Sequence, residues 1–590
     1  MEKFLTLCMI VKNEENVLNR CLMSIHSLVD EIIIIDTGSV DNTVEIASRY
    51  TDKIFHFKWT EDFSEARNYA GKFATSKWII YLDADEYVDK ENFVNALSEL
   101  KKSLESNDKI DAFVVNQINF LGDFSNSTGV CPTTRLYKNK NNIKFKRKIH
   151  EQLHKDEGIL FIEKINLNIF HTGYNAENIK DKNKSERNLK LITQEIENSK
   201  NAFDYYNLGN EYLAIEDTNK ALEYYHKAYL NEKNKEKLWI PLNVERLIYC
   251  LIEVERFAEA LKIANEAITT WSNIVDFKTQ KALIMYLTYE RNESLIEFEN
   301  IVNSKDLEIL SNYSYKNFIP FRFLGELYEE IGNVELAVYN YSKAAFYNKE
   351  DIGNLSRFYN ILSKNVNHND FIEFVDKNVI SNDIDKSRLL KILLDKGEVI
   401  LFKKIIEYYN IKYSDSINFK INLISNKYNI AQLIYKKTSL NDLLNDGWTD
   451  KYDIFILYLI TGKENILEKL NNHTEVFYES NDVKHTFKEK DFLNLLDKCI
   501  SYGKFELIDK IFNEFNLSEY SESIGNLFFE NNFKEIALDI YLMNSEKHLK
   551  VSKKTRNKIL NYIKEEKNDF ELMHWKDLFE EKNINLNKNI

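Results

Sequence analysis

Short apolar runs alternate with amphipathic stretches along the first part of the chain. The runs are too short and too uniformly apolar for amphipathic helices, and they are typical of strands buried on both faces of a parallel sheet. The runs lie at 5–11, 31–35, 53–57 and 78–82, and the helical stretches between them lie at 15–28, 43–50 and 63–74. This alternation predicts a three-layer α/β domain with a mainly parallel sheet.

Beyond about residue 185 the pattern changes to long stretches with helical spacing. They are rich in Leu, Tyr, Glu, Lys and Asn, contain few glycines, and hold only two further prolines, Pro241 and Pro320. Because glycine and proline both weaken helices, this composition predicts an almost entirely helical region.

One spacing of small and aromatic residues recurs in the helical region. The three copies are Gly209, Ala221 and Tyr225; Gly325, Ala337 and Tyr341; and Gly525, Ala537 and Tyr541, of which the third is the weakest match. A small residue on each of two antiparallel helices lets their backbones approach, and the aromatic ring fills the groove between them. The spacing resembles tetratricopeptide repeats and predicts a solenoid.

The length of the chain, 590 residues, requires more than one hydrophobic core. We predict an α/β domain over residues 1–185 and tetratricopeptide-like repeats over 186–350. The rest, 351–590, is expected to be a degenerate helical-repeat region, because no repeat can be aligned between about 350 and 515.

Composition narrows the class of protein. The apolar fraction of 44% argues against wholesale disorder, and the formal charge of −14 argues against a broad nucleic-acid-binding face. The five cysteines form no Cys-x-x-Cys pair, so neither a zinc knuckle nor a disulfide framework is expected. Neither a signal peptide nor a membrane span is expected, and a cytoplasmic location fits these features best.

The candidate chemistry centres on an Asp-x-Asp (DXD) motif, Asp83 and Asp85, directly after the apolar run at 78–82. Two carboxylates at a strand end can hold Mg²⁺ or Mn²⁺ against a diphosphate, since hard oxygen ligands suit these ions. Alone, such a pair more often only solvates a turn.

Neighbouring segments add to this motif. They are 9–15 (MIVKNEE), 35–43 (IDTGSVDNT), 59–68 (WTEDFSEARN), 134–137 (TRLY), 145–151 (FKRKIHE) and 169–175 (IFHTGYN). Together with the Asp-x-Asp motif they resemble the family 2 glycosyltransferases of the GT-A fold, over about residues 4 to 180. The resemblance extends to members of that family that carry repeat tails and glycosylate peptides.

The resemblance implies roles for individual residues. The donor nucleotide would be bound by Val11, Asn13, Glu14, Asp36, Arg67 and Asp83. A divalent ion, Mn²⁺ or Mg²⁺, would be held by Asp85 and His171, while Glu151 would be the catalytic base and His150 would position it or the acceptor. Inverting transfer needs such a base to take the acceptor's proton.

Each assignment has a plainer structural alternative. The segment 36–43 also fits a helix cap made by Asp41 or Asn42. Arg67 also fits a surface salt bridge, and a lone histidine such as His171 is more often structural than a ligand.

Three functions are compatible with these residues. The first is an inverting, metal-dependent transfer of glucose or N-acetylglucosamine from a UDP-sugar to a protein or peptide side chain, for example of flagellin or a secreted peptide. The second moves the sugar to a cell-surface polysaccharide or lipopolysaccharide instead. The third is a non-catalytic scaffold that binds proteins through its repeats. Solenoid edges can also pair, so an oligomer is compatible with the sequence.

Overall fold

The computed structural model describes residues 3–121, 127–172, 201–473, 488–514, 520–531, 533–545 and 551–566, with short pieces within 188–196, 479–486 and 574–579. By their internal contacts they divide into two compact units, one of residues 1–284 with 295–320 and one of residues 285–294 with 321–590. The predicted division at residues 185 and 350 stays a prediction.

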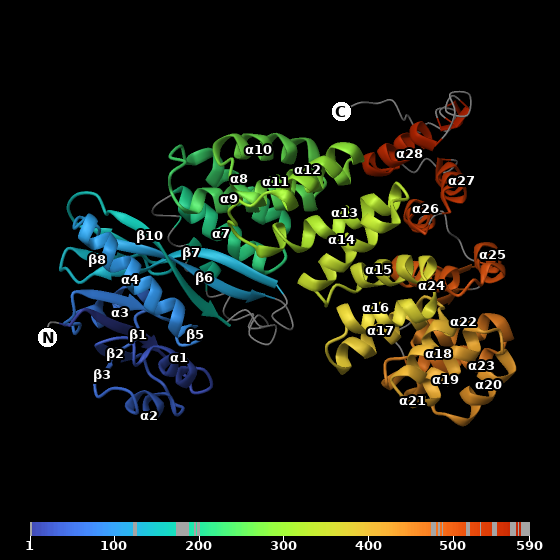
Figure 1. Ribbon diagram of the computed structural model, residues 1–590, viewed down its shortest axis with the longest axis horizontal. Helices are drawn as coiled ribbons and strands as arrows, with labels where there is room; N and C mark the ends of the chain where they lie inside the picture. Colours follow the sequence, from blue (N-terminus) through green and yellow to red (C-terminus); the bar gives the residue numbers. More distant parts are fainter. Residues whose placement is uncertain are drawn as a thin grey trace. The chain divides into compact units, whose positions relative to one another are not determined.

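An eight-stranded sheet forms the centre of the first unit, in the order β3-β2-β1-β4-β7-β6-β10-β5 (Figure 1). Its strands are β1 (Leu5–Val11), β2 (Glu31–Asp36), β3 (Ile54–His56), β4 (Trp78–Tyr81), β5 (Glu86–Val88), β6 (Ala112–Leu121), β7 (Ser127–Lys138) and β10 (Ile162–His171). Strands β3, β2, β1 and β4 are parallel, whereas β7 runs antiparallel to β4 and β6. The predicted α/β fold is confirmed, with a mixed sheet.

Both faces of the sheet are covered. Helices α1 (Leu18–Ile25), α2 (Thr43–Ser48) and α4 (Lys90–Ser106) contribute to the apolar core on one face. On the other face lie α3 (Phe63–Gly71) and the hairpin of β8 (Ile143–Lys146) and β9 (Gln152–Lys155). Residues of β2 alternate between the two cores, which explains why its run of isoleucines is uninterrupted.

A buried carboxylate anchors the sheet at the amino-terminal end of β2. Glu31 accepts hydrogen bonds from Thr6 Oγ1 (2.7 Å) and the Thr75 backbone (2.8 Å), and it pairs with Lys3 and Lys53. Burial by itself would raise the pKa of Glu31, but these hydrogen bonds outweigh it and lower the pKa to about 2. The carboxylate therefore stabilises the fold in its charged form.

Helices follow in antiparallel pairs after the sheet. They are α7 (Ala202–Ala214), α8 (Thr218–Asn231), α9 (Trp239–Glu253), α10 (Phe257–Thr270), α11 (Val275–Leu287), α12 (Arg291–Asn303), α13 (Phe318–Glu330) and α14 (Val334–Tyr347), with a 3₁₀ turn at Tyr313–Tyr315. The described parts of 351–590 add α15 (Ile352–Asn365), α16 (His368–Asn378), α17 (Asp383–Asp395), α18 (Val399–Tyr408), α19 (Asp415–Ile424), α20 (Tyr428–Lys437), α21 (Leu440–Asn445), α22 (Lys451–Thr461), α23 (Glu464–His473), α24 (Glu489–Ser501), α25 (Phe505–Glu514), α26 (Ser521–Glu530), α27 (Lys534–Ser545) and α28 (Lys553–Glu566), and a small hairpin of β11 (Glu479–Asn481) and β12 (Lys484–Thr486). The predicted helical tail is confirmed.

The recurring glycines and tyrosines pack as the repeat spacing predicts. A Cβ atom built on Gly209 would lie 2.6 Å from the ring of Tyr225, and one on Gly325 would lie 2.5 Å from the ring of Tyr341. Gly525 meets Tyr541 in the same way. All three rings are fully buried, so only glycine fits beneath them.

The third copy shares a hydrogen bond with the first. The Tyr225 hydroxyl donates to Asn210 Oδ1 and the Tyr541 hydroxyl donates to Asn526 Oδ1, both at 2.8 Å. In the second copy, the Tyr341 hydroxyl instead donates to Glu329 at 2.6 Å. The copy that matched least well in sequence is therefore equivalent to the first in its packing.

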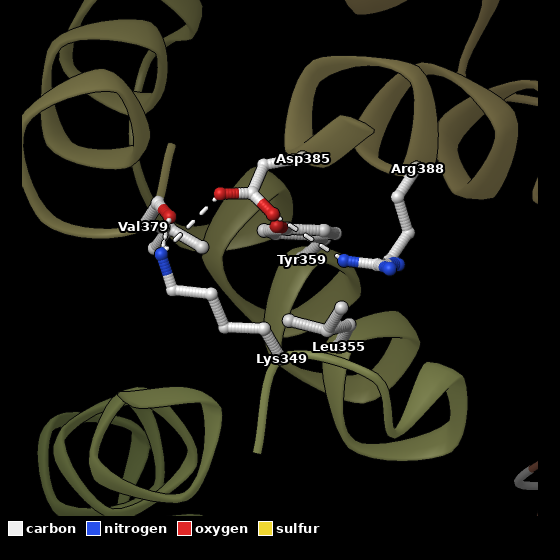
Figure 2. Close-up of a pocket in the computed structure, with 6 residues that line it drawn as sticks. All are labelled: Lys349, Leu355, Tyr359, Val379, Asp385 and Arg388. Atoms are coloured by element: carbon white, nitrogen blue, oxygen red, sulfur yellow. Dashed lines mark hydrogen bonds and ion pairs between the residues drawn. The ribbon is translucent and has the colours of Figure 1, made fainter. Parts of the chain in front are cut away.

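The helices without an alignable repeat are joined by ion pairs to buried carboxylates. Lys349 Nζ donates to the Val379 carbonyl (2.9 Å) and lies 3.3 Å from Asp385, which also lies 3.4 Å from Arg388 (Figure 2). Farther along, Lys498 lies 2.9 Å from the fully buried Asp453. These pairs bring distant segments together without a recurring sequence pattern.

Candidate active site

Two loops at the carboxyl ends of β1 and β2 are joined into one surface. Thr37 N and Oγ1 donate to the Val11 carbonyl at 3.0 and 3.2 Å. Asn13 N donates to Ser39 Oγ (3.0 Å), and Glu14 N donates to Thr43 Oγ1 (2.7 Å). The predicted donor-binding residues of the first strand end therefore lie against the loop that follows Asp36.

The side chain of Val11 is buried in the core, so only its backbone is available to a ligand. Asn13 adopts a left-handed conformation with φ of 58°, and its Oδ1 accepts from Val40 N at 2.9 Å. The turn is thus shaped by Asn13 itself, because asparagine tolerates this conformation better than most residues.

Asp36 is held by its own turn. Its carboxylate accepts from Gly38 N (3.2 Å) and Ser39 N (3.0 Å) and lies 3.1 Å from His56 Nδ1. Burial would raise the pKa of Asp36, but these hydrogen bonds outweigh it and lower the pKa. Gly38 has φ of +107°, which favours glycine at this position.

The helix-cap alternative holds for part of the same segment. Asp41 Oδ1 accepts from Thr43 N at 3.1 Å and from Thr43 Oγ1 at 2.6 Å, whereas Asn42 makes no side-chain cap. Asp41 Oδ2 also accepts from Glu15 N at 3.2 Å. Asp41 therefore caps α2 and joins it to the β1 loop.

Asp83 lies between two arginines. Arg67 Nη2 from α3 and Arg135 Nη2 from β7 each lie 3.1 Å from one of its carboxylate oxygens. Burial would raise the pKa of Asp83, but Arg135 and then Arg67 outweigh it and hold the pKa well below its usual range. The side chain stays 43% exposed, so it remains accessible to a ligand.

Arg67 also reaches the predicted base. Its Nε donates to Glu151 Oε1 at 2.9 Å, and both side chains are largely buried. Because Arg67 also pairs with Asp83, one guanidinium group connects Asp83 to Glu151. The arginine fixes the direction of the Glu151 carboxylate.

A carboxylate and an arginine without an assigned role complete this cluster. Glu86 is fully buried and accepts from Arg135 (2.5 Å), Gln117 Nε2 (2.8 Å) and Asp83 N (2.8 Å). Burial raises the pKa of Glu86. Arg135 is the extra residue of a β-bulge, since Thr134 and Leu136 pair with the consecutive residues Val114 and Phe113. The quoted segment 134–137, which contains Arg135, was the available sequence signal.

Asp85 and His171 are in direct contact. His171 Nε2 lies 3.1 Å from Asp85 Oδ2, and His171 Nδ1 lies 2.8 Å from Asn119 Oδ1. Burial would lower the pKa of His171, but the bond to Asp85 outweighs it and raises the pKa. Thr172 Oγ1 and Arg20 donate to the Asp85 carbonyl at 3.1 and 3.2 Å. The matching residues 173–175 lie outside the described part of the chain.

His150 faces a different neighbour from Glu151. Its Nε2 lies 3.8 Å from Glu211 Oε1 on α7, and its φ is 52°. The structure therefore places Glu151 beside the Arg67 cluster and His150 beside the first helix pair. The catalytic roles of both residues stay predictions.

The donor set at Asp85 and His171 suits a divalent ion. In the tautomer that donates its Nδ1 proton to Asn119, Nε2 carries the lone pair that a metal needs, next to a carboxylate oxygen. No group of three or more His, Cys, Asp or Glu side chains suited to a metal occurs among the described residues. The two residues would share the ion with oxygens of the donor or water.

These geometries coincide with a sequence match. Residues 6–154 match the model described as Glycosyl transferase family 2. The chain carries a family 2 glycosyltransferase domain. In the described residues, no helix has the length and apolar character needed to cross a bilayer.

Two curated relatives match part of this chain. A TPR repeat-containing protein of Synechococcus elongatus is 35% identical over 192 residues, which are 31% of this chain and 45% of the relative. The SPbeta prophage-derived glycosyltransferase SunS of Bacillus subtilis is 32% identical over 237 residues, which are 39% of this chain and 54% of the relative. The chain spans about half the length of these curated relatives.

A solved structure, S. aureus TarS 1-349 in complex with UDP-GlcNAc, aligns with a TM-score of 0.26 and 14% identity over 47% of this chain and 90% of that one.

Proposed function

We propose that this chain is an inverting, metal-dependent glycosyltransferase that moves glucose or N-acetylglucosamine from a UDP-sugar to a protein or peptide side chain. The observation that carries the proposal is the connected cluster of Asp83, Arg67 and Glu151 beside the Asp85–His171 pair, inside the family 2 domain. The helical pairs support a polypeptide acceptor, as does the resemblance to repeat-tailed members of the family that glycosylate peptides. A cytoplasmic location belongs to the same proposal, since all five cysteines are free thiols.

In this proposal the strand-end loops bind the nucleotide. Asn13, Glu14 and Asp36 face the base and ribose, and Asp83 and Arg67 lie toward the diphosphate. Asp85 and His171 would hold Mn²⁺ or Mg²⁺, which neutralises charge on the departing diphosphate.

Glu151 performs the proton transfer. The acceptor oxygen or sulfur attacks the anomeric carbon, the bond from that carbon to the diphosphate breaks, and the acceptor proton passes to Glu151. Arg67 fixes the direction of the Glu151 carboxylate. His150, on the side of α7, would contact the acceptor.

The test is to incubate the purified chain with Mn²⁺ and a panel of UDP- and GDP-sugars, and to measure nucleotide release and thermal shift. We expect metal-dependent binding and slow hydrolysis of one UDP-sugar. If the folded protein neither binds nor hydrolyses any sugar nucleotide of the panel, the proposed enzymatic activity is rejected and the non-catalytic scaffold is favoured.

One substitution separates donor binding from proton transfer. Glu151→Gln keeps the shape and should bind the donor like the wild type but lose transfer to the acceptor. Full transfer by this variant would show that Glu151 is not the base. Recovery of labelled sugar in the polysaccharide fraction of a lysate, and none in protein, would redirect the acceptor to a polysaccharide.

A further inference from the structure

This inference rests on the proposed function and concerns how the acceptor is recognised. It starts at the amino-terminal half of β7, where a loop of the helical region meets the sheet. Val130 N donates to the Ser311 carbonyl at 2.6 Å, and Gly129 forms a bridge with Asn312. The buried Asp276 accepts from Leu310 N (2.9 Å) and Ser311 N (2.8 Å). The loop is therefore fixed from both sides.

The same loop positions a buried carboxylate on α9. The Tyr315 hydroxyl donates to Glu245 Oε1 at 3.0 Å, and Gln280 Nε2 donates to the Glu245 carbonyl at 3.0 Å. Glu245 is 1% exposed, and its Oε2 lies 3.4 Å from Arg246 Nε. Arg246 is thus oriented through its Nε, which leaves its two terminal nitrogens directed elsewhere.

Arg246 offers these terminal nitrogens to a ligand. Its side chain is 41% exposed, and within the described residues it has the single ion pair with Glu245 and no hydrogen bond to either terminal nitrogen. A guanidinium group binds a carboxylate through two parallel hydrogen bonds, which gives both affinity and direction.

The loop that contains Ser311 and Tyr315 connects Arg246 with β7, since Tyr315 holds the neighbouring Glu245 and Ser311 accepts from Val130 N. Burial raises the pKa of the Cys131 thiol on β7, and the nearby charges of Arg246 and then Arg135 act against it. Tyr206 of α7 is close to both Cys131 and Arg246. Arg135 contacts Asp83 directly, so β7 connects Arg246 with the candidate active site.

We propose that Arg246 binds the carboxylate of an Asp or Glu side chain in the acceptor polypeptide. Cys131 and Arg135 are four residues apart on β7, and an extended chain rises ~3.3 Å per residue, so they are separated by ~13 Å. An extended acceptor running beside β7 therefore places its acidic residue about four positions from the residue that receives the sugar.

The test uses labelled peptides of about a dozen residues, built from Gly, Ala and Asn around one central Ser, with Glu or Gln at each other position in turn. Fluorescence polarisation measures their binding to the full chain with UDP present. We expect the wild type to bind Glu about tenfold more tightly than Gln at an offset near four residues on one side.

Two variants assign this preference to Arg246. Arg246→Met should bind Glu and Gln equally, and Arg246→Lys should keep part of the preference, because it retains the charge without the fork. Arg256→Met is the matched control, since Arg256 is an exposed arginine of the same helical region that pairs with Glu259. It should behave like the wild type.

Equal binding of Glu and Gln by the wild type, including no binding of either, overturns the inference. So does a preference that survives in Arg246→Met. Metal-dependent hydrolysis of the UDP-sugar, measured without peptide on the same proteins, should be equal in the wild type and Arg246→Met. Its absence would instead reject the proposed function, which keeps the two failures distinct.

Discussion

The strand ends of the α/β domain and the helix pairs of the tail use different side chains to fix their geometry. At the strand ends, charged groups hold one another, as Arg67 does with Asp83 and Glu151. In the helix pairs, a tyrosine ring fills the space above a glycine, as Tyr225 does above Gly209. The charged groups at the strand ends leave polar atoms available to a ligand. The glycines and tyrosines of the helix pairs are instead buried in packing contacts. A recurring motif can therefore mark architecture alone, and a motif that occurs once can mark chemistry.

The largest effect is expected where charge serves the reaction. Asp85→Asn removes a predicted metal ligand and the partner of His171, and we expect metal-dependent sugar transfer to fall ~100-fold or more. Asp156→Asn, which changes a half-exposed carboxylate, should leave the rate unchanged. Removing the metal with EDTA should lower the wild-type rate similarly. Normal activity of Asp85→Asn would show that the charge has no catalytic part.

Charge also stabilises the far end of the same sheet. Because the pKa of Glu31 is lowered from 4.5 to about 2, its contribution is present above the unfolded value and is lost as the pH falls from 4.5 through about 2. We expect about 2 kcal/mol, allowing for screening of the two half-exposed lysines. Hydrogen exchange of β1 and β2 amides measures this loss.

Glu31→Gln tests that origin. The variant should already lack the stabilisation at neutral pH and show a flatter acid dependence of amide protection. Glu45→Gln, an exposed carboxylate paired with Arg49, is the control and should keep the wild-type profile. An unchanged acid dependence in Glu31→Gln would assign the loss to other groups.

The packing of the repeats is tested in α26 and α27, which carry the third copy of the glycine–tyrosine spacing. Gly525→Ala forces a methyl group against the ring of Tyr541 and should destabilise α26 and α27 by about 1–3 kcal/mol. Gly353→Ala is the control, because the nearest atom to its methyl group would lie at 3.3 Å, whereas the Tyr541 ring lies much closer to a methyl group at Gly525. Protease sensitivity and hydrogen exchange report the local stability, and binding of the UDP-sugar should not change. A tolerated Gly525→Ala would remove the third copy from the repeat.

The smallest effect concerns one hydrogen bond. Tyr541→Phe keeps the ring and removes the bond to Asn526 Oδ1, which should cost about 1 kcal/mol. The same change at Tyr225 should cost a similar amount. A double-mutant cycle with Asn526→Ala should show coupling between the two side chains. Strict additivity would mean that the ring alone stabilises the pair.

The sequence predicted the fold where a local pattern determines it. Uninterrupted isoleucines in β2 and the glycine–tyrosine spacing each follow from one element and its neighbour. The pairing of Lys349 with Asp385 follows no such pattern, because it joins segments that are not related by a repeat. This explains why the region after residue 350 was predicted to be helical without a repeat that could be aligned.

The candidate site was predicted in part for the same reason. Asp83 and Asp85 follow β4 and His171 ends β10, and the family resemblance supplied their expected roles. Glu86 and the β-bulge at Arg135 were not assigned, since the partner strand decides which residue is the extra one. The bond between Arg67 and Glu151 spans 84 positions, a separation at which residue spacing carries no information.

The contact between Val130 and Ser311 has a consequence for handling the protein. Within the described sheet, β4 pairs with β7 only at residues 136–138, so the preceding half of β7 presents one side without a neighbouring strand of the sheet. The loop around Ser311 occupies that side at Val130. A fragment that ends soon after the sheet would leave unpaired backbone amides there, which favours self-association. Fragments intended to stay monodisperse should therefore extend beyond residue 315.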